Sequence, residues 1–154
     1  MTAAGYGLWY WVAKLTGAPL DIGPVDWPAL RRRPSRNDAL VCPTGLCPNA
    51  APDHGAKIYA MPPAALLARL NDIVLADGNT RTLPADAGRA RFIQYTRLMR
   101  FPDTIDIDVF PASNGSTLAI YSRSLVGRKD FGVNRARVER WMAALDATAP
   151  SASP

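Results

Sequence analysis

The sequence contains few of the residue types that most catalytic and metal sites use. Its 154 residues include two cysteines, one histidine and one glutamate beside 12 aspartates. The histidine, His54, lies in a loop rich in Pro, Asp and Gly, where only the adjacent Asp53 offers a partner for a general base. Ser122 and Ser124 show no relation to a histidine that would indicate a nucleophilic triad. We therefore predict no catalytic residue and no cofactor.

Long hydrophobic runs are also missing, because no stretch approaches the roughly 18–20 apolar residues that a transmembrane helix needs. The N-terminus lacks the basic start and the cleavage site of a signal peptide. It does carry Leu8, Trp9, Tyr10 and Trp11 in succession. Aromatic rings of this kind suit the headgroup region of a bilayer, and they equally suit a short helix packed on a domain. Residues 1–16 are predicted to be an interfacial segment or a packing segment.

Lysine is scarce too, with three residues against 15 arginines, and the formal net charge is +5. A basic protein of this kind invites a nucleic-acid hypothesis. The positive residues are scattered over four regions, however, and no basic stretch is interleaved with aromatic residues that would stack on bases. We predict no nucleic-acid partner.

Residues 17–36 have the composition of a linker. Four prolines interrupt any helical or strand period, since each removes a backbone donor and restricts the residue before it. The segment ends in a basic run that contains Arg31, Arg32 and Arg33. Such a run can hold an anionic membrane surface, at about 1 kcal/mol per basic residue close to it. It can also be a solvated charge run before a folded domain.

Residues 37–146 are predicted to form a single α+β domain. Apolar residues at helical spacing predict a helix that starts at Pro62-Pro63 and closes at Gly78. A second helix is expected over 134–145, with Asn134 as its N-cap. Short strands are expected at 57–60, 80–84, 89–96, 103–110 and 117–123. These elements predict an antiparallel sheet of four to five strands with two helices packed on one face, preceded by an extended N-terminal segment. Residues 147–154 are predicted to be a flexible tail.

The last two strands have a predicted register. Alternation places three apolar side chains on one face of the strand over 103–110 and two aspartates on the other. Asn114-Gly115 is typical of a two-residue hairpin loop, which would put Val109 opposite Ile120 and Asp106 opposite Arg123. A slip of two residues would leave every side chain on its predicted face.

Cys42 and Cys47 are separated by four residues and flanked by prolines. We expect a disulfide, which would stabilise the protein by roughly 2 kcal/mol on chain-entropy grounds and persist only in an oxidising compartment. Free buried thiols are an alternative. A metal or redox site would need His54 and Asp53 as well, and one thiol pair with one histidine falls short of a zinc signature. We therefore predict no metal.

Four segments of the chain resemble a known family in the same order. They are IGPVDW at 22–27, NDALVCPTGLC at 37–47, TRLMRFPDTIDIDVF at 96–110 and YSRSLVGRKDFGVNRARVERW at 121–141. On these motifs the chain is identified as similar to the bacterial and plastid "domain of unknown function" family numbered 1499. The resemblance implies no reaction. It does imply that relatives often carry an N-terminal membrane helix or export signal ahead of the IGPVDW-like segment.

Arginines, aspartates and one asparagine gather at strand ends, in one loop and at a helix start. Arginine forks pair with carboxylates through two hydrogen bonds, so these groups could fasten the loop to the sheet. The same groups, with the amides of a helix start, could instead bind an anion. The members of this predicted polar cluster are Arg97, Arg100, Asp103, Asp106, Arg123, Asp130, Asn134, Arg135 and Arg137.

Taken together, these features predict a non-catalytic accessory or binding module. Its expected partner is a membrane surface or a membrane-protein complex, reached on the periplasmic side through residues 1–36. One alternative is a carrier of a small apolar ligand or lipid, held between a curved sheet and a long helix. Another is an enzyme that acts on an anionic substrate through the polar cluster.

Overall fold

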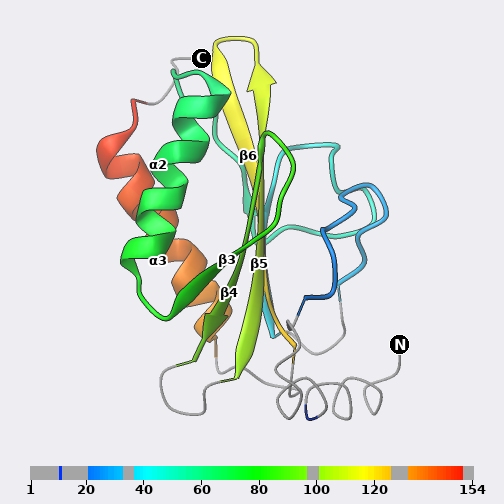
Figure 1. Ribbon diagram of the computed structural model, residues 1–154. Coiled ribbons are helices and arrows are strands. Elements are labelled where there is room, and N and C mark those ends of the chain that lie inside the picture. Colours follow the sequence, from blue (N-terminus) through cyan, green and yellow to red (C-terminus); the bar gives the residue numbers. More distant parts are fainter. Residues whose placement is uncertain (1–10, 12–20, 33–36, 97–100, 126–131, 151–154) are drawn as a thin grey trace.

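The structure is a computed structural model that describes residues 11, 21–32, 37–96, 101–125 and 132–150. Within these residues the chain forms six strands and two long helices (Figure 1). The strands are β1 (Asp38–Cys42), β2 (His54–Gly55), β3 (Thr80–Leu83), β4 (Arg89–Tyr95), β5 (Pro102–Ala112) and β6 (Gly115–Ser124). The helices are α2 (Pro63–Ala76) and α3 (Val133–Thr148).

The six strands form one sheet in the order β2-β1-β6-β5-β4-β3. All neighbours are antiparallel except β1 and β2, which are parallel. The α+β class is confirmed, but the predicted sheet of four to five antiparallel strands differs from the structure, which has six strands and one parallel pair. The sequence concealed β1 because it is buried along its whole length and so shows no alternation. The strand expected at 57–60 is instead a single bridge between Tyr59 and Ser116.

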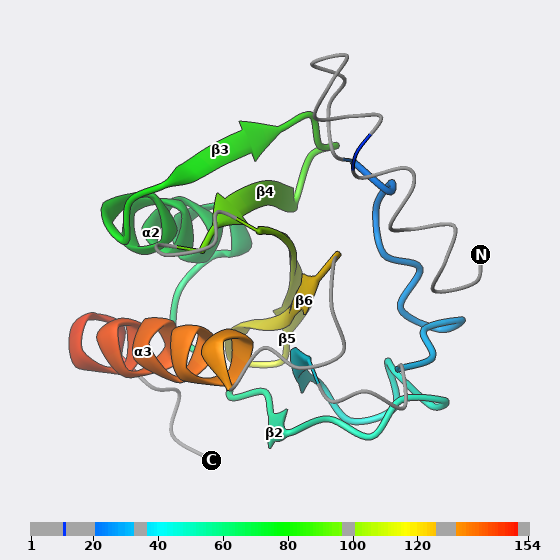
Figure 2. The same cartoon turned by 90° about the horizontal axis from the view of Figure 1, so that it is seen from below.

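Both helices lie on the same face of the sheet, as predicted (Figure 2). In α2 the residues Leu66, Leu70 and Val74 recur at a spacing of four and are fully buried. In α3 the buried apolar residues are Val138, Trp141 and Leu145. Together with the side chains that β4, β5 and β6 direct to this face, they form the main hydrophobic core.

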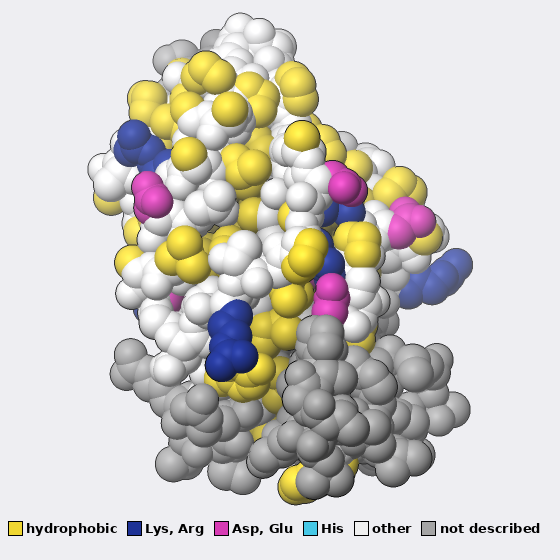
Figure 3. Space-filling view, viewed as in Figure 1, with side chains coloured by type: hydrophobic (Ala, Val, Ile, Leu, Met, Phe, Trp, Pro, Cys, Tyr) yellow, Lys and Arg dark blue, Asp and Glu magenta, His cyan; other side chains and the backbone are white. Residues whose placement is uncertain are grey.

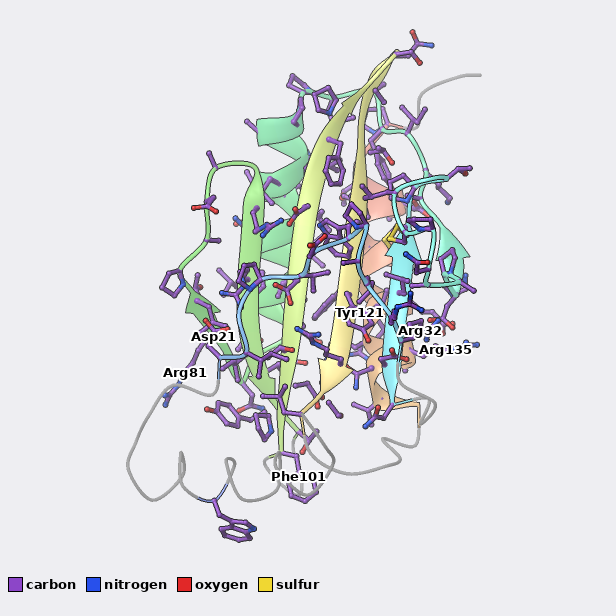
Figure 4. The ribbon with its side chains drawn as sticks, turned by 90° about the vertical axis from the view of Figure 1, so that its right-hand side faces the viewer. Asp21, Arg32, Arg81, Phe101, Tyr121 and Arg135 are labelled. Atoms are coloured by element: carbon purple, nitrogen blue, oxygen red, sulfur yellow. A yellow bond between two sulfur atoms is a disulfide. The ribbon has the colours of Figure 1, made fainter. Side chains whose placement is uncertain are left out.

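The opposite face of the sheet is crossed by residues 21–32, which we call the strap (Figure 4). Val25, Trp27 and Leu30 of the strap are buried in a second core with side chains of β1 and β6 and with both cysteines. A linker was predicted over 17–36 on the strength of its prolines. Residues 21–32 instead pack as part of the folded body, because their apolar side chains cover this face of the sheet.

The β5–β6 hairpin keeps the predicted faces and shifts the predicted register by two residues. Its last pair is Ala112 with Gly115, so Val109 lies opposite Leu118 and Asp106 lies opposite Tyr121. The loop is therefore Ser113-Asn114 and not Asn114-Gly115. The backbone of Gly115 explains the shift, because a Cβ at this position would come within 2.0 Å of the Tyr59 carbonyl oxygen. Only glycine fits there, so it becomes the first residue of β6.

The C-terminal helix is longer than predicted. It begins after Gly132, which adopts a left-handed conformation, and it ends at Thr148. Ala149 is buried, and the Ala60 amide donates a hydrogen bond to the Pro150 carbonyl at 2.9 Å. Residues 147 and 148 of the predicted tail thus continue the helix, residues 149 and 150 contact the domain, and residues 151–154 lie outside the described part. Within the described residues, no helix is long and apolar enough to cross a membrane.

Candidate functional site

A buried polar cluster lies between the main core and the start of α3. Arg137 Nη2 donates to Asp103 Oδ2 at 2.8 Å, and Ser124 Oγ donates to the other oxygen of Asp103 at 2.6 Å. Arg137 Nη1 also reaches Ser122 Oγ at 3.0 Å and Asn134 Oδ1 at 2.9 Å. All five residues are buried. The cluster therefore fastens the first turn of α3 to β5 and β6 from within.

The spacing of these residues follows from the elements that carry them. Ser122 and Ser124 are two apart on β6, so both face the helices. Asn134 and Arg137 are three apart on α3 and share one side of its first turn. Asn134 was predicted to cap this helix, and that prediction is wrong. Its side chain turns inward, accepts from Ser122 and donates to the Asn37 carbonyl at 3.1 Å.

A second set of ion pairs lies on the strap face of the sheet, along β4 and β5. Arg89 pairs with Asp108 through two hydrogen bonds of 2.7 and 2.5 Å. Asp108 also accepts from the indole nitrogen of Trp27 at 2.9 Å. Two residues further along β4, Arg91 donates to Asp106 at 2.9 Å. It also donates to both carboxylate oxygens of Asp21. The strap is thus held to β4 and β5 by one indole and one guanidinium.

Further ion pairs of the strap face lie along β1, toward the edge of the sheet. Arg32 Nη2 lies 2.7 Å from Asp38 and 2.9 Å from Asp53. Asp38 accepts a further hydrogen bond of 2.6 Å from the Tyr121 hydroxyl. Asp53 accepts from the Leu40 amide at 2.9 Å and from Arg135 at 2.6 Å. Figure 4 shows Tyr121, Arg32 and Arg135 on this side of the sheet.

The pKa values of these groups reflect their partners. The hydrogen bond from Arg91 lowers the pKa of Asp21. Burial acts to raise the pKa of Asp53, but the Leu40 amide and Arg32 outweigh it, so the pKa is lowered. Asp106 is the exception, because burial raises its pKa in spite of Arg91 and Arg123. Burial and the bond to Asp38 raise the pKa of Tyr121, which keeps its hydroxyl protonated.

Arg123 was expected to pair with Asp106 across the hairpin. The shift in register places Thr104 opposite Arg123, and Arg123 Nε donates to the Thr104 hydroxyl at 3.2 Å. Asp106 lies at the limit of an ion pair, 3.9 Å from Arg123 Nη2. The guanidinium also stacks over the Tyr121 ring, 5.2 Å from its centre. Arg91 and not Arg123 is therefore the principal partner of Asp106.

The structure divides the predicted polar cluster between two faces of the sheet. Asp103, Asn134 and Arg137 meet on the helix face, whereas Asp106 and Arg123 lie on the strap face. Arg135 is exposed and joins the strap-face set through Asp53. The remaining predicted members, Arg97, Arg100 and Asp130, lie outside the described residues.

The predicted membrane contacts differ in their exposure. Trp11 is 57% exposed and Arg31 is exposed, which leaves both accessible to a surface. Arg32 instead turns inward and pairs with Asp38 and Asp53. Leu8, Trp9, Tyr10 and Arg33 lie outside the described residues.

The two cysteines form the predicted disulfide, which links the end of β1 to the following loop. Both sulfur-bearing side chains are buried in the second core beneath the strap. His54 is exposed, and its Nε2 lies 3.3 Å from Glu139 of α3. Within the part of the chain that the structure describes, no three His, Cys, Asp or Glu side chains gather as metal ligands would.

Sequence reasoning missed most of the strap-face set. The signal was present in one pair of strands, because Arg89 and Arg91 alternate on β4 as Asp106 and Asp108 alternate on β5. Equal spacing of opposite charges on adjacent strands favours cross-strand pairing. Asp21, Asp38 and Asp53 gave no comparable signal, since their partners depend on the path of the strap.

Comparison with known protein families assigns the chain to one of them. The chain belongs to the family of proteins of unknown function described as DUF1499, whose model matches residues 35–145. This confirms the resemblance found in the sequence motifs. No curated protein matches the chain.

Two solved structures are weakly similar to this chain. Protein MLL2253 from Mesorhizobium loti is 11% identical with a TM-score of 0.45, and the match covers 60% of this chain and 95% of that one. Protein CV1439 from Chromobacterium violaceum is 14% identical with a TM-score of 0.37, over 60% of this chain and 93% of that one. Likenesses this weak carry no argument about function.

Proposed function

We propose that the protein is a non-catalytic binding or accessory module that works at a membrane surface, on the oxidising side of that membrane. The observation that carries the proposal is how the domain uses its arginines. Each of the arginines at positions 32, 89, 91, 135 and 137 holds an aspartate of the same chain. Arginines engaged in this way build a scaffold, whereas an enzyme for an anionic substrate needs them for its ligand.

Three further features support the location. The disulfide between Cys42 and Cys47 suits an oxidising compartment such as the periplasm. The exposed ring of Trp11 belongs to an aromatic segment of the kind that favours headgroup depth. The basic balance of the chain, with a net charge of +5, adds attraction to anionic lipids.

The carrier hypothesis receives less support from the packing. The region between the helices and the sheet holds the large side chains of Trp141, Phe92 and Tyr59, all fully buried. Large rings in this position fill the space that a carrier would keep for its ligand. We therefore favour the binding or accessory module.

Vesicle flotation tests the proposal. The full-length protein and a variant that lacks residues 1–20 are mixed with phosphatidylcholine vesicles, with or without phosphatidylserine. The deletion stops before Asp21, because Asp21 holds Arg91 and the strap completes the fold. We expect only the full-length protein to float, and more of it with the anionic lipid. Equal flotation of the two forms would contradict the part given to residues 1–20, and failure of both forms to float would remove the membrane role.

A further inference from the structure

At one end of the sheet lie the ends of several strands and of α2, which are far apart in the sequence. The register pairs Tyr95 with Pro102, and Asp103 with Ser124, so β4 and β6 finish where β5 begins. The side chain of Gln94 donates to the Gly78 carbonyl at 3.1 Å, which places the end of α2 at the same level. The β5–β6 hairpin lies at the other end of the molecule (Figure 1). We call the end opposite the hairpin the strand-terminal end.

The strand-terminal end carries partly exposed apolar side chains. Ile93 and Leu125 are buried in a small cluster of their own, and four partly buried side chains pack around them. These four are Ile22, Leu83, Tyr95 and Phe101. Figure 4 shows Phe101 beyond the ends of the strands, at the lowest point of the described sheet.

The helices add two more apolar groups on the other side of this end. Leu75, in the last turn of α2, is 47% exposed, and Val133, the first residue of α3, is 40% exposed. Figure 3 shows the face of the molecule that α2 and β3 form, with hydrophobic and charged side chains interspersed on it. Apolar side chains that rim one end of a molecule mark an interaction surface more clearly than single scattered ones.

Charge and chain path indicate what the surface contacts. Arg81 is exposed and lies over the Tyr95 ring at 5.9 Å, so a basic group accompanies the aromatic one. The aromatic N-terminal segment joins the domain at Asp21, and the next residue, Ile22, packs in the cluster at this end. Partly exposed aromatic side chains and exposed aliphatic ones beside an arginine match the headgroup region of an anionic bilayer.

We infer that the strand-terminal end is the face that the domain turns toward an anionic lipid bilayer. The inference rests on the proposed function and extends it from an attached N-terminus to a fixed orientation. The apolar side chains at this end enter the headgroup region, Arg81 contacts lipid phosphates, and the β5–β6 hairpin points away from the bilayer.

Quenching by lipids with brominated acyl chains tests the orientation. Trp9 and Trp11 are changed to phenylalanine in the full-length chain, and flotation checks that this background still binds. Trp27 and Trp141 are buried, so they contribute a constant signal. One reporter tryptophan is then added by Leu75→Trp at the strand-terminal end. Its matched control is Ile58→Trp near the hairpin, where Ile58 is 39% exposed.

We expect brominated phosphatidylserine vesicles to remove most of the added emission of Leu75→Trp and to leave that of Ile58→Trp unchanged. Leu75→Ser with Val133→Ser should also weaken vesicle binding about tenfold, whereas Ile58→Ser should not. If the wild type does not float, the proposed function fails and the inference with it. If the background variant floats but Leu75→Trp is quenched no more than Ile58→Trp, the orientation is wrong and the membrane role stands.

Discussion

Arg137 of α3 and Asp103 of β5 form an ion pair inside the protein, with a distance of 2.8 Å and side chains that are 3% and 0% exposed. Arg135, two residues earlier on the same helix, pairs with Asp53 at 2.6 Å but is 53% exposed. The helix thus presents one arginine to the interior and one to solvent. Because the two pairs differ mainly in burial, they allow a matched comparison.

We expect Arg137→Ala to destabilise the protein by about 3–5 kcal/mol, because it leaves the Asp103 carboxylate buried without its cation. Arg135→Ala should cost less than about 1 kcal/mol, since Arg135 itself is exposed and Arg32 still holds Asp53. Denaturant unfolding of both variants measures the difference. Equal losses for the two would contradict the role given to the buried cluster.

For Arg123→Ala we expect a loss of about 1 kcal/mol, between those of the two helix variants. The change removes the bond to Thr104 and the stacking on Tyr121, but Arg91 still holds Asp106. Arg91→Ala provides the comparison and should cost several times more, because it releases both Asp106 and Asp21. The prediction is wrong if the unfolding curves rank these variants in the opposite order.

The disulfide yields a prediction about stability and location. The double change Cys42→Ser and Cys47→Ser should lower the free energy of unfolding by roughly 2 kcal/mol. Intact mass after thiol trapping, with and without reductant, should show no alkylated cysteine in protein taken from its native compartment before reduction. Two alkylated thiols under trapping conditions would rule out the oxidising compartment that we propose.

Gly115 should tolerate no side chain. Its φ is +148°, and a Cβ would approach the Tyr59 carbonyl oxygen to 2.0 Å. We expect Gly115→Ala to cost about 2–3 kcal/mol through backbone strain and displacement of the Tyr59 bridge. Gly55→Ala is the control, because a Cβ there meets nothing within 4 Å. Thermal unfolding of the two variants measures the contrast, and a neutral Gly115→Ala would refute it.

The dependence of stability on pH should reveal the lowered pKa of Asp53. An unfolded aspartate has a pKa of about 3.9, and Arg32 and the Leu40 amide hold the folded value below its ordinary range. The unfolded chain therefore binds the proton first as pH falls, so the contribution of Asp53 is present above about pH 4 and is lost below it. Asp53→Asn should show a shallower loss of stability in acid than the wild type. Parallel curves for the two proteins would contradict this assignment.

The sequence predicted the elements whose pattern is local. The helix from Pro63 and the faces of β5 follow from periods of 3.6 and 2, which do not depend on distant parts of the chain. The register of the hairpin could not be settled locally, because the Tyr59 carbonyl from another segment decides where Gly115 must lie.

The path of the strap and the partners of its side chains could not be predicted from a local pattern, for the same reason. Prolines indicated an extended path over residues 21–32, but not that Trp27 would find Asp108 or that Arg32 would turn to Asp38. The cluster around Arg137 was predicted in part, as fastening between a loop and the sheet. The division of the predicted polar cluster between two faces depends on the sheet, which keeps alternate residues of β5 on opposite sides.

The path of the strap has a mechanical consequence. A pull on the strap from its N-terminal side acts first on Asp21, to which two nitrogens of Arg91 donate hydrogen bonds. The load then passes to Trp27 and finally to Arg32, so three fastenings on three different strands oppose it in sequence. Any tension that the first 20 residues transmit is thereby spread across the width of the sheet, and no single strand is peeled from its neighbour.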